Sequence, residues 1–106
     1  MKLTGDLLRG HTDMILLAIL AEEDSYGYQI NKRIEEVSNG TFILTEATLY
    51  TSFKRLEQKG LVVSYWQKGA SNKKRKYYAI TLEGLNALKH LKQSWKEAKE
   101  VIDSLI

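Results

Sequence analysis

The chain has 106 residues, which suits a single domain with a modest core. Of these residues, 43% are hydrophobic and 27% are charged, which is typical of a globular protein rather than a disordered one. The absence of cysteine excludes disulfides and thiolate metal sites, and a net charge of +3 is weak support for a nucleic-acid partner.

The first helix is predicted at about residues 6–22. Its second half, Met14 to Ala21, is apolar on every face and therefore has to be covered on all sides. In so small a protein, part of that cover is expected from a partner. The same run is well short of the roughly 20 residues that span a bilayer, and no small-residue cleavage site follows it. We therefore expect a cytoplasmic protein with no membrane partner.

A second helix is expected at about residues 26–38, between an N-cap at Ser25 and a stop at Asn39-Gly40. Apolar residues recur on it at helical spacing and predict one buried stripe. The stripe consists of Ile30, Ile34 and Val37.

A third helix is expected at about residues 46–59, capped by Thr45 and ended by Gly60. Its buried stripe is predicted to be Leu49, Phe53 and Leu56. The opposite face begins with small and polar side chains and continues with basic ones, which suits a helix that enters a DNA groove.

The hydrophobic pattern then changes from helical to alternating. Residues 61–67 and 76–81 are rich in β-branched and aromatic types, and the stretch KGASNKKR lies between them, so a hairpin with a long tip is predicted. From residue 68 to residue 76 the basic residues are Lys68, Lys73, Lys74, Arg75 and Lys76, with no acid among them. Such a run is either a solvated loop or an electrostatic contact. Its place directly after the third helix favours the contact.

The last helix is expected from about Leu82 almost to the C-terminus. Its apolar residues form an a/d heptad seam, which packs either on the same domain or on a second chain. Because the helix is terminal, we favour a homodimer. The predicted interface residues are Leu88, Leu91, Trp95, Ala98, Ile102 and Leu105.

Three helices followed by a two-stranded ribbon give the order of a winged helix-turn-helix. The predicted fold class is therefore mainly α with a small β-hairpin wing (α+β), comprising a DNA-binding domain at residues 1–81 and a dimerisation helix at 82–106. In this geometry the third helix enters the major groove of double-stranded DNA, and the wing contacts the backbone or the minor groove. The predicted contacts are Thr45, Ala47, Thr48, Tyr50, Thr51, Lys54, Arg55, Lys73, Lys74, Arg75 and Lys76.

Several motifs also resemble one known family. The segment TEATLYTSFKRLEQKGLV, preceded by RGHTDMILLAIL and SYGYQI and followed by KRKYYAIT, is similar to the PadR-type transcriptional regulators over nearly the whole chain. The short C-terminal part resembles the compact, multidrug-binding branch of that family. The resemblance implies a homodimeric repressor on a pseudo-palindromic operator, in which the last helix packs on the first helix of the partner.

The same resemblance implies a small-molecule effector. In the drug-binding branch a tryptophan of the last helix faces its symmetry mate across a cavity for flat aromatic ligands, which release the DNA. The residues that match this cavity are Trp95, Met14, Leu17 and Ala18. Because Trp95 lies on the heptad seam, a purely structural role at the dimer interface remains the alternative.

An enzyme is not expected. His11 and His90 are far apart, no glycine-rich phosphate loop is present, and the acids are scattered on helices beside lysines. We therefore predict no catalytic residue, metal or cofactor.

Two other binding functions are alternatives. A winged helix can serve as a protein-interaction module, but such a module would not need the basic run at residues 73–76. RNA binding would call for exposed stacking aromatics. We expect the aromatics of the ribbon to pack on it instead, namely Tyr65, Trp66, Tyr77 and Tyr78.

Overall fold

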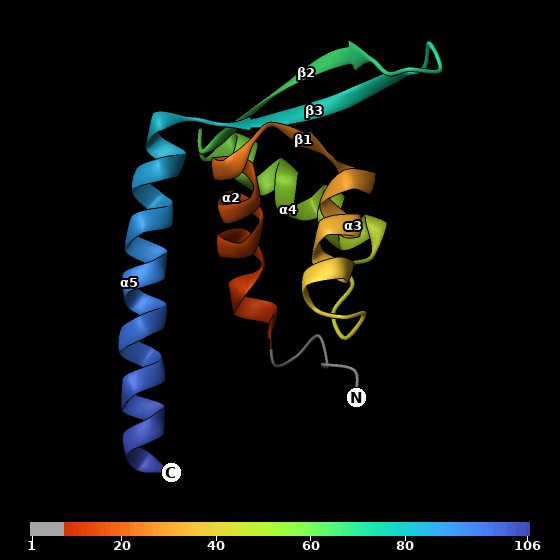
Figure 1. The fold of residues 1–106 in the computed structure, drawn as a ribbon. Helices are drawn as coiled ribbons and strands as arrows, with labels where there is room; N and C mark the ends of the chain where they lie inside the picture. The colour runs from red at the N-terminus through yellow and green to blue at the C-terminus, as the bar shows by residue number, and fades with distance from the viewer. Residues whose placement is uncertain (1–7) are drawn as a thin grey trace.

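The structure is a computed structural model that describes residues 8–106. Figure 1 shows a group of helices beneath a small sheet, with a long final helix along one side. The elements are η1 (Arg9–His11), α2 (Thr12–Glu22), β1 (Ser25–Tyr26), α3 (Gly27–Val37), α4 (Glu46–Gln58), β2 (Val62–Lys68), β3 (Lys74–Ile80) and α5 (Leu82–Leu105). The predicted α+β fold class is confirmed. The part of the first predicted helix before residue 8 lies outside the described residues.

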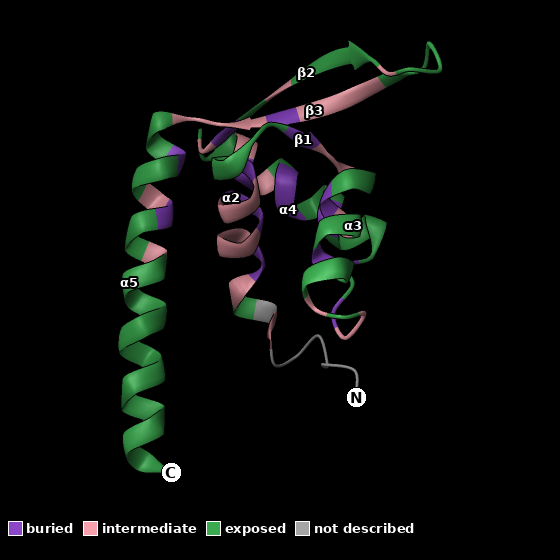
Figure 2. Ribbon diagram, in the orientation of Figure 1, coloured by how far each residue is buried: buried purple, intermediate pink, exposed green. Residues whose placement is uncertain are grey.

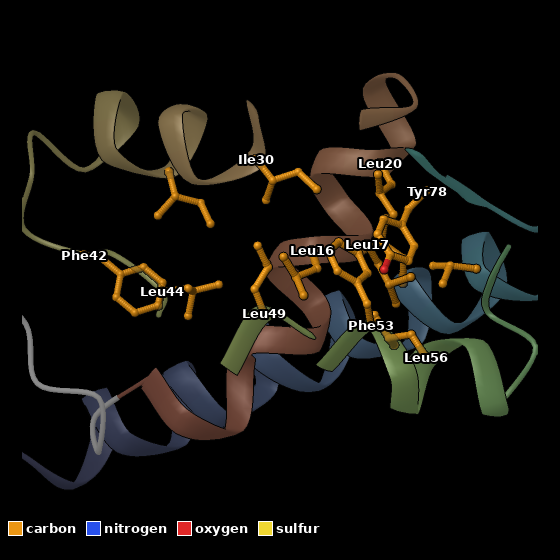
Figure 3. Packing of buried hydrophobic residues seen from close by; sticks show 13 residues of the cluster. Leu16, Leu17, Leu20, Ile30, Phe42, Leu44, Leu49, Phe53, Leu56 and Tyr78 are labelled. Atoms are coloured by element: carbon orange, nitrogen blue, oxygen red, sulfur yellow. The ribbon is translucent and has the colours of Figure 1, made fainter. Parts of the chain in front are cut away.

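Helix α2 lies at the centre of the core. Leu16, Leu17 and Leu20 are buried, and α2 lies between α5 on one side and α3 and α4 on the other (Figure 1). Figure 3 shows these leucines among the buried side chains of α4 and the sheet, where the Phe53 ring stacks on Tyr78 with centroids 3.8 Å apart. The outer faces of α2 are only half-buried, at Met14, Ile15, Ala18 and Ile19.

The N-cap predicted at Ser25 was wrong. Ser25 is buried and pairs with Tyr78 in the sheet, and its hydroxyl donates to the Gln29 side chain at 2.6 Å. Helix α3 therefore begins at Gly27, directly after a two-residue strand. A strand this short has no periodicity of its own and gave no sequence signal.

The predicted buried stripe of α3 holds only in part. Ile30 and Ile34 are buried, but Val37 is 68% exposed. Phe42 and Leu44 enter the core from the loop after the helix instead.

The sheet has three antiparallel strands in the order β1-β3-β2. The β2–β3 register runs from Val62 opposite Ile80 to Lys68 opposite Lys74. The hairpin tip is therefore only residues 69–73, shorter than predicted, because strand pairing continues through the basic run.

Both helices that flank the wing start at a hydroxyl cap, the predicted one at Thr45 and one at Thr81 that was not predicted. The Thr45 hydroxyl accepts from the Thr48 backbone N–H at 3.1 Å, and the Thr81 hydroxyl accepts from that of Gly84 at 3.0 Å. Gly60, with φ of 73°, follows the end of α4 as predicted. The predicted stripe of α4 is confirmed as buried, at Leu49, Phe53 and Leu56.

The heptad seam of α5 divides into two parts. Leu88 belongs to the protomer core and Leu91 packs at its edge. The C-terminal half of the helix extends beyond the domain and is exposed throughout (Figure 2). Within residues 8–106, no helix is long and apolar enough to cross a membrane.

Candidate nucleic-acid interface

Helix α4 presents the predicted face to solvent. Its buried side anchors the helix on α2 and the sheet, so the other side is held outward on a rigid base. The exposed residues on or next to this helix include six predicted DNA contacts: Thr45, Ala47, Thr48, Tyr50, Thr51 and Lys54.

The surface is hollowed on both sides of α4. One hollow, of about 620 Å³, is lined by Ala47, Thr48 and Thr51 together with the preceding loop. A second, of about 440 Å³, lies between Tyr50 of α4 and Lys76 of the wing. The first turns of α4 therefore form a ridge, which is the shape that enters a groove.

A side chain that sequence reasoning missed fixes the start of α4. The Asn31 amide donates to the Leu44 carbonyl at 2.9 Å and accepts from the Leu44 N–H at 3.3 Å. This two-way bond ties the loop before α4 to α3. The only sequence feature that could have indicated this contact was an asparagine next to Ile30 of the buried stripe. Such a residue does not identify a partner that lies thirteen residues away in the chain.

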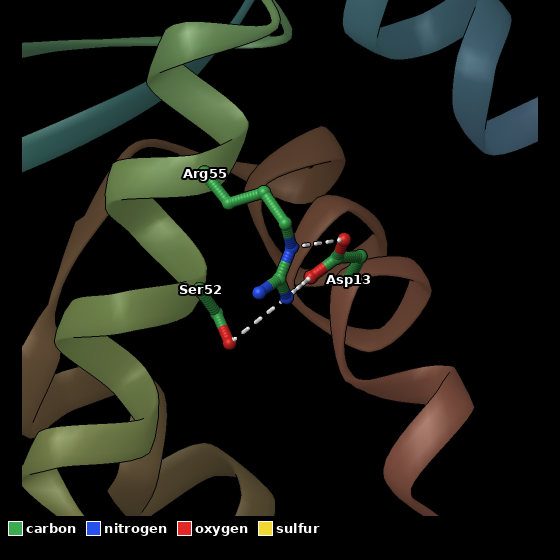
Figure 4. A network of polar contacts seen from close by, with 3 residues as sticks. All are labelled: Asp13, Ser52 and Arg55. Atoms are coloured by element: carbon green, nitrogen blue, oxygen red, sulfur yellow. Dashed lines mark hydrogen bonds and ion pairs between the residues drawn. The ribbon is translucent and has the colours of Figure 1, made fainter.

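Arg55 has a partner inside the protein (Figure 4). Its guanidinium forms a two-pronged ion pair with the Asp13 carboxylate of α2, in which Nε donates at 3.1 Å, and it also donates to the Ser52 hydroxyl at 3.4 Å. The hydrogen bond to Asp13 raises the pKa of Arg55. Arg55 therefore clamps α4 to α2.

The basic residues of the wing fall into two groups. Lys68, Lys73 and Lys74 are exposed. Lys76 pairs with Glu57 of α4 at 3.8 Å.

Arg75 folds back on the sheet. Its guanidinium lies 4.6 Å from the Tyr26 ring centroid and donates to the Tyr26 hydroxyl at 2.8 Å. A Cβ on Gly69 would come within 3.1 Å of this guanidinium, so glycine leaves room for it. Arg75 thus stiffens the base of the tip.

The aromatics of the ribbon do not all pack on it. Tyr78 is buried, and burial raises its pKa. The Tyr65 hydroxyl donates to Asp24 at 2.7 Å, and this bond raises the pKa of Tyr65 to about 12. Tyr77 stacks on Tyr65. The expectation for Trp66 was wrong, because this side chain is 66% exposed.

The residues predicted for dimer and ligand contacts differ in burial. Leu17 and Leu88 lie in the protomer's own core and have almost no free surface. Met14, Ala18 and Leu91 are half-buried. The exposed ones are Trp95, Ala98, Ile102 and Leu105.

The fold and this interface can be compared with known proteins. Residues 16–90, which include the core, α4 and the whole wing, match the sequence profile of the PadR-like transcriptional regulators. The chain belongs to this family. PadR-like regulators act by binding DNA, so this protein is a DNA-binding regulator and not an enzyme.

Solved structures support the assignment. A transcriptional regulator of Clostridium thermocellum is 40% identical with a TM-score of 0.88, over 95% of this chain and 98% of that one. A PadR family regulator of Clostridium difficile is 37% identical with a TM-score of 0.76, and the match covers 88% of this chain and 95% of that one.

Two curated relatives differ in length. An uncharacterised protein of Lysinibacillus sphaericus is 44% identical, and the match covers 93% of this chain and 91% of that protein's length. A transcriptional regulator of Escherichia coli is 25% identical over 88% of this chain, but that match covers only 43% of its own length.

Proposed function

We propose that this PadR-like protein is a cytoplasmic repressor that binds a pseudo-palindromic operator as a homodimer. The observation that carries the proposal is the ridge of α4, whose first turns are small, polar, exposed and firmly anchored. A dimer seated on an operator would exclude polymerase from overlapping DNA, so repression is the proposed outcome.

In the proposed complex, α4 enters the major groove by its N-terminal end. Its free N–H groups and positive dipole end favour phosphate. The Thr45 and Thr48 hydroxyls, which bond to each other at 2.9 Å in the free protein, are placed to reach bases or backbone. Lys54 lies further along α4, where the helix would leave the groove and meet the DNA backbone. Arg55 and Arg75 act by holding α4 and the wing in place.

The homodimer is proposed from two different apolar surfaces on one protomer. The exposed side of α5 carries Trp95, Ile102 and Leu105. An apolar hollow of about 340 Å³ lies between α2 and α3, lined in part by Ile15 and Ala18. A two-fold axis would place α5 of each protomer against α2 of the other and cover both surfaces twice.

The proposed effector is a flat aromatic molecule bound where the two Trp95 side chains meet. Trp95 is 42% exposed, and its ring packs edge-on against His11 at 4.9 Å. Part of the indole therefore remains free in the protomer. Met14 and Ala18 would add partly exposed apolar surface, with Leu17 behind them.

Quenching of tryptophan fluorescence by a planar cationic dye tests the effector. We expect quenching in the wild type and in Trp66→Phe, but not in Trp95→Phe. Equal quenching in both variants would contradict a site at Trp95.

Footprinting tests the function as a whole. The protein should select a duplex from genomic fragments and protect two patches related by two-fold symmetry, with recognition helices about 34–36 Å apart. Transcription from that promoter in vitro should fall on adding protein. A footprint without two-fold symmetry would contradict the homodimer, and an unchanged transcript level would contradict repression.

A further inference from the structure

A large exposed aromatic stands on the wing. Tryptophan is highly buried on average, yet Trp66 is 66% exposed in the middle of β2, where it lies opposite Lys76. The predicted interface, built from small, polar and basic residues, does not include it.

The strand register shows which way Trp66 faces. Side chains alternate along a strand, so Val62, Ser64 and Trp66 share one face. Val62 is buried in the core, and the Ser64 hydroxyl donates to Glu57 of α4 at 3.2 Å. The face that carries Trp66 is therefore the one turned towards α4.

This face is also positively charged. Residues directly opposite in an antiparallel ladder lie on the same side, so Lys68, Lys74 and Lys76 share the face of Trp66. Lys68 and Lys74 are exposed beyond it towards the tip, and Lys76 pairs with Glu57 at 3.8 Å. The indole thus lies among three lysines, on the side from which DNA held by α4 would approach.

We infer that Trp66 contacts the DNA backbone, an inference that rests on the DNA-binding mode proposed above. The indole lies against a deoxyribose next to the groove that α4 enters, and Nε1–H, a donor without acceptor capacity, bonds to a phosphate oxygen. Lys68 and Lys74 neutralise the flanking phosphates.

Charge favours DNA over a protein as the occupant of this face. A protein surface that covered the indole would also strip water from neighbouring lysines, which is costly unless each finds an acid. A nucleic-acid backbone offers regularly spaced anions together with the apolar edges of its sugars. Because backbone contacts carry no direct sequence information, Trp66 fixes position and affinity rather than sequence preference.

The experiment compares Trp66→Ala and Trp66→Phe with Val63→Ala as the matched control. Val63 is exposed on the same strand, but on the opposite face. The probes are a duplex of about three helical turns, selected from random-sequence DNA by the wild-type protein, and an unrelated duplex of equal length. Binding is measured by fluorescence anisotropy over a series of salt concentrations, and folding is checked by thermal unfolding.

Trp66→Ala should weaken binding to both duplexes by more than about tenfold, because it loses the apolar contact with the sugar as well as a hydrogen bond to a charged group, which alone contributes about tenfold or more. The ratio between the two affinities should stay the same. The salt slope should also stay at the wild-type value, because the indole releases no counterion. Trp66→Phe, which keeps an apolar ring but loses the N–H, should give an intermediate reduction. Val63→Ala should bind as the wild type does.

Two outcomes separate this inference from the proposed function. If the wild type binds the selected duplex and folded Trp66→Ala binds it equally well, the inferred role of Trp66 is wrong and the proposed function stands. If the wild type binds no duplex, the proposed function fails and the role of Trp66 fails with it.

Discussion

Two arginines of the interface are held by partners within the protein before any DNA is present. Arg55 is bound by Asp13, 42 residues away in the chain, and Arg75 by Tyr26, 49 residues away. The first bond fixes α4 on α2, and the second fixes the base of the wing. Both arginines were predicted as DNA contacts, Arg55 from its type and helical face and Arg75 from its place in the basic run of the wing. Their partners could not be predicted, because nothing in a local pattern identifies contacts so distant in sequence.

The Asp13–Arg55 bond gives a prediction for stability. Asp13→Asn should lower the free energy of unfolding by about 1 kcal/mol, the effect of losing a charged hydrogen bond that is partly exposed. Glu22→Gln is the control, because the Glu22–Arg33 ion pair, at 3.4 Å, is more exposed. Exposed pairs contribute about 0–1 kcal/mol to the free energy of unfolding, and we expect this one to lie near the low end of that range. Urea unfolding measures both variants. Equal destabilisation of the two would contradict a special role for the Asp13 clamp.

The bond between Tyr65 and Asp24 gives a pH prediction. Because the pKa of Tyr65 is raised to about 12 in the folded state, the contact stabilises the fold below the ordinary tyrosine pKa of about 10. That stabilisation is lost as pH rises through the folded value. Tyrosine ring resonances labelled with carbon-13 should show one residue titrating late, and Asp24→Asn should return it towards the ordinary value. A late titration that persists in this variant would contradict the assignment.

At the scale of elements, helices were predictable where periodicity and caps agree. The predicted signals at Thr45 and Gly60 each lie at a real boundary, because a hydroxyl cap or a left-handed glycine acts locally. The errors came from long-range structure. Strand β1 forms only because Ser25 and Tyr26 pair with β3. Strand β3 begins before the predicted residue 76 because Lys74 and Arg75 continue the pairing with β2.

The junction between the wing and α5 is sensitive to a single methyl group. A Cβ on Gly84 would lie 2.1 Å from the Leu61 carbonyl oxygen and 2.6 Å from an Ile80 side-chain carbon. Gly84→Ala should therefore destabilise the fold by about 3 kcal/mol or more, at or above the upper end of overpacking costs. Gly10→Ala is the control, since a Cβ there meets no described atom within 4 Å. Similar melting temperatures for the two variants would show that the junction is looser than described.

At the scale of the whole molecule, α5 is longer than the domain beside it. Its first turns are held by the core, whereas its C-terminal half stands clear in Figure 1 and exposes apolar side chains. The seam was visible in the sequence as one continuous pattern. Where it changes from intramolecular packing to free surface could not be predicted, because that point depends on the size of the folded domain.

The proposed dimer follows from that free half of α5. Ile102→Lys should produce monomers at micromolar concentration, because a charge would be buried in the interface without a partner. Ser104→Lys, in the same part of α5 but on the opposite side of the helix, adds the same charge and should leave the dimer intact. Light scattering measures the mass. A dimeric Ile102→Lys protein would contradict this interface.

The most direct test of the central claim, that the α4 ridge and the lysine-bearing wing together bind operator DNA, is anisotropy of a labelled duplex from the region upstream of the gene. We predict tight binding that weakens steeply with salt and exceeds binding to an unrelated duplex. The double change of Lys73 and Lys74 to alanine should lower the salt slope by about 0.9 for each phosphate that the wing no longer neutralises, whereas the same change at Lys92 and Lys96 of α5 should not. Weak binding without sequence preference, or an unchanged slope in the wing variant, would contradict the account.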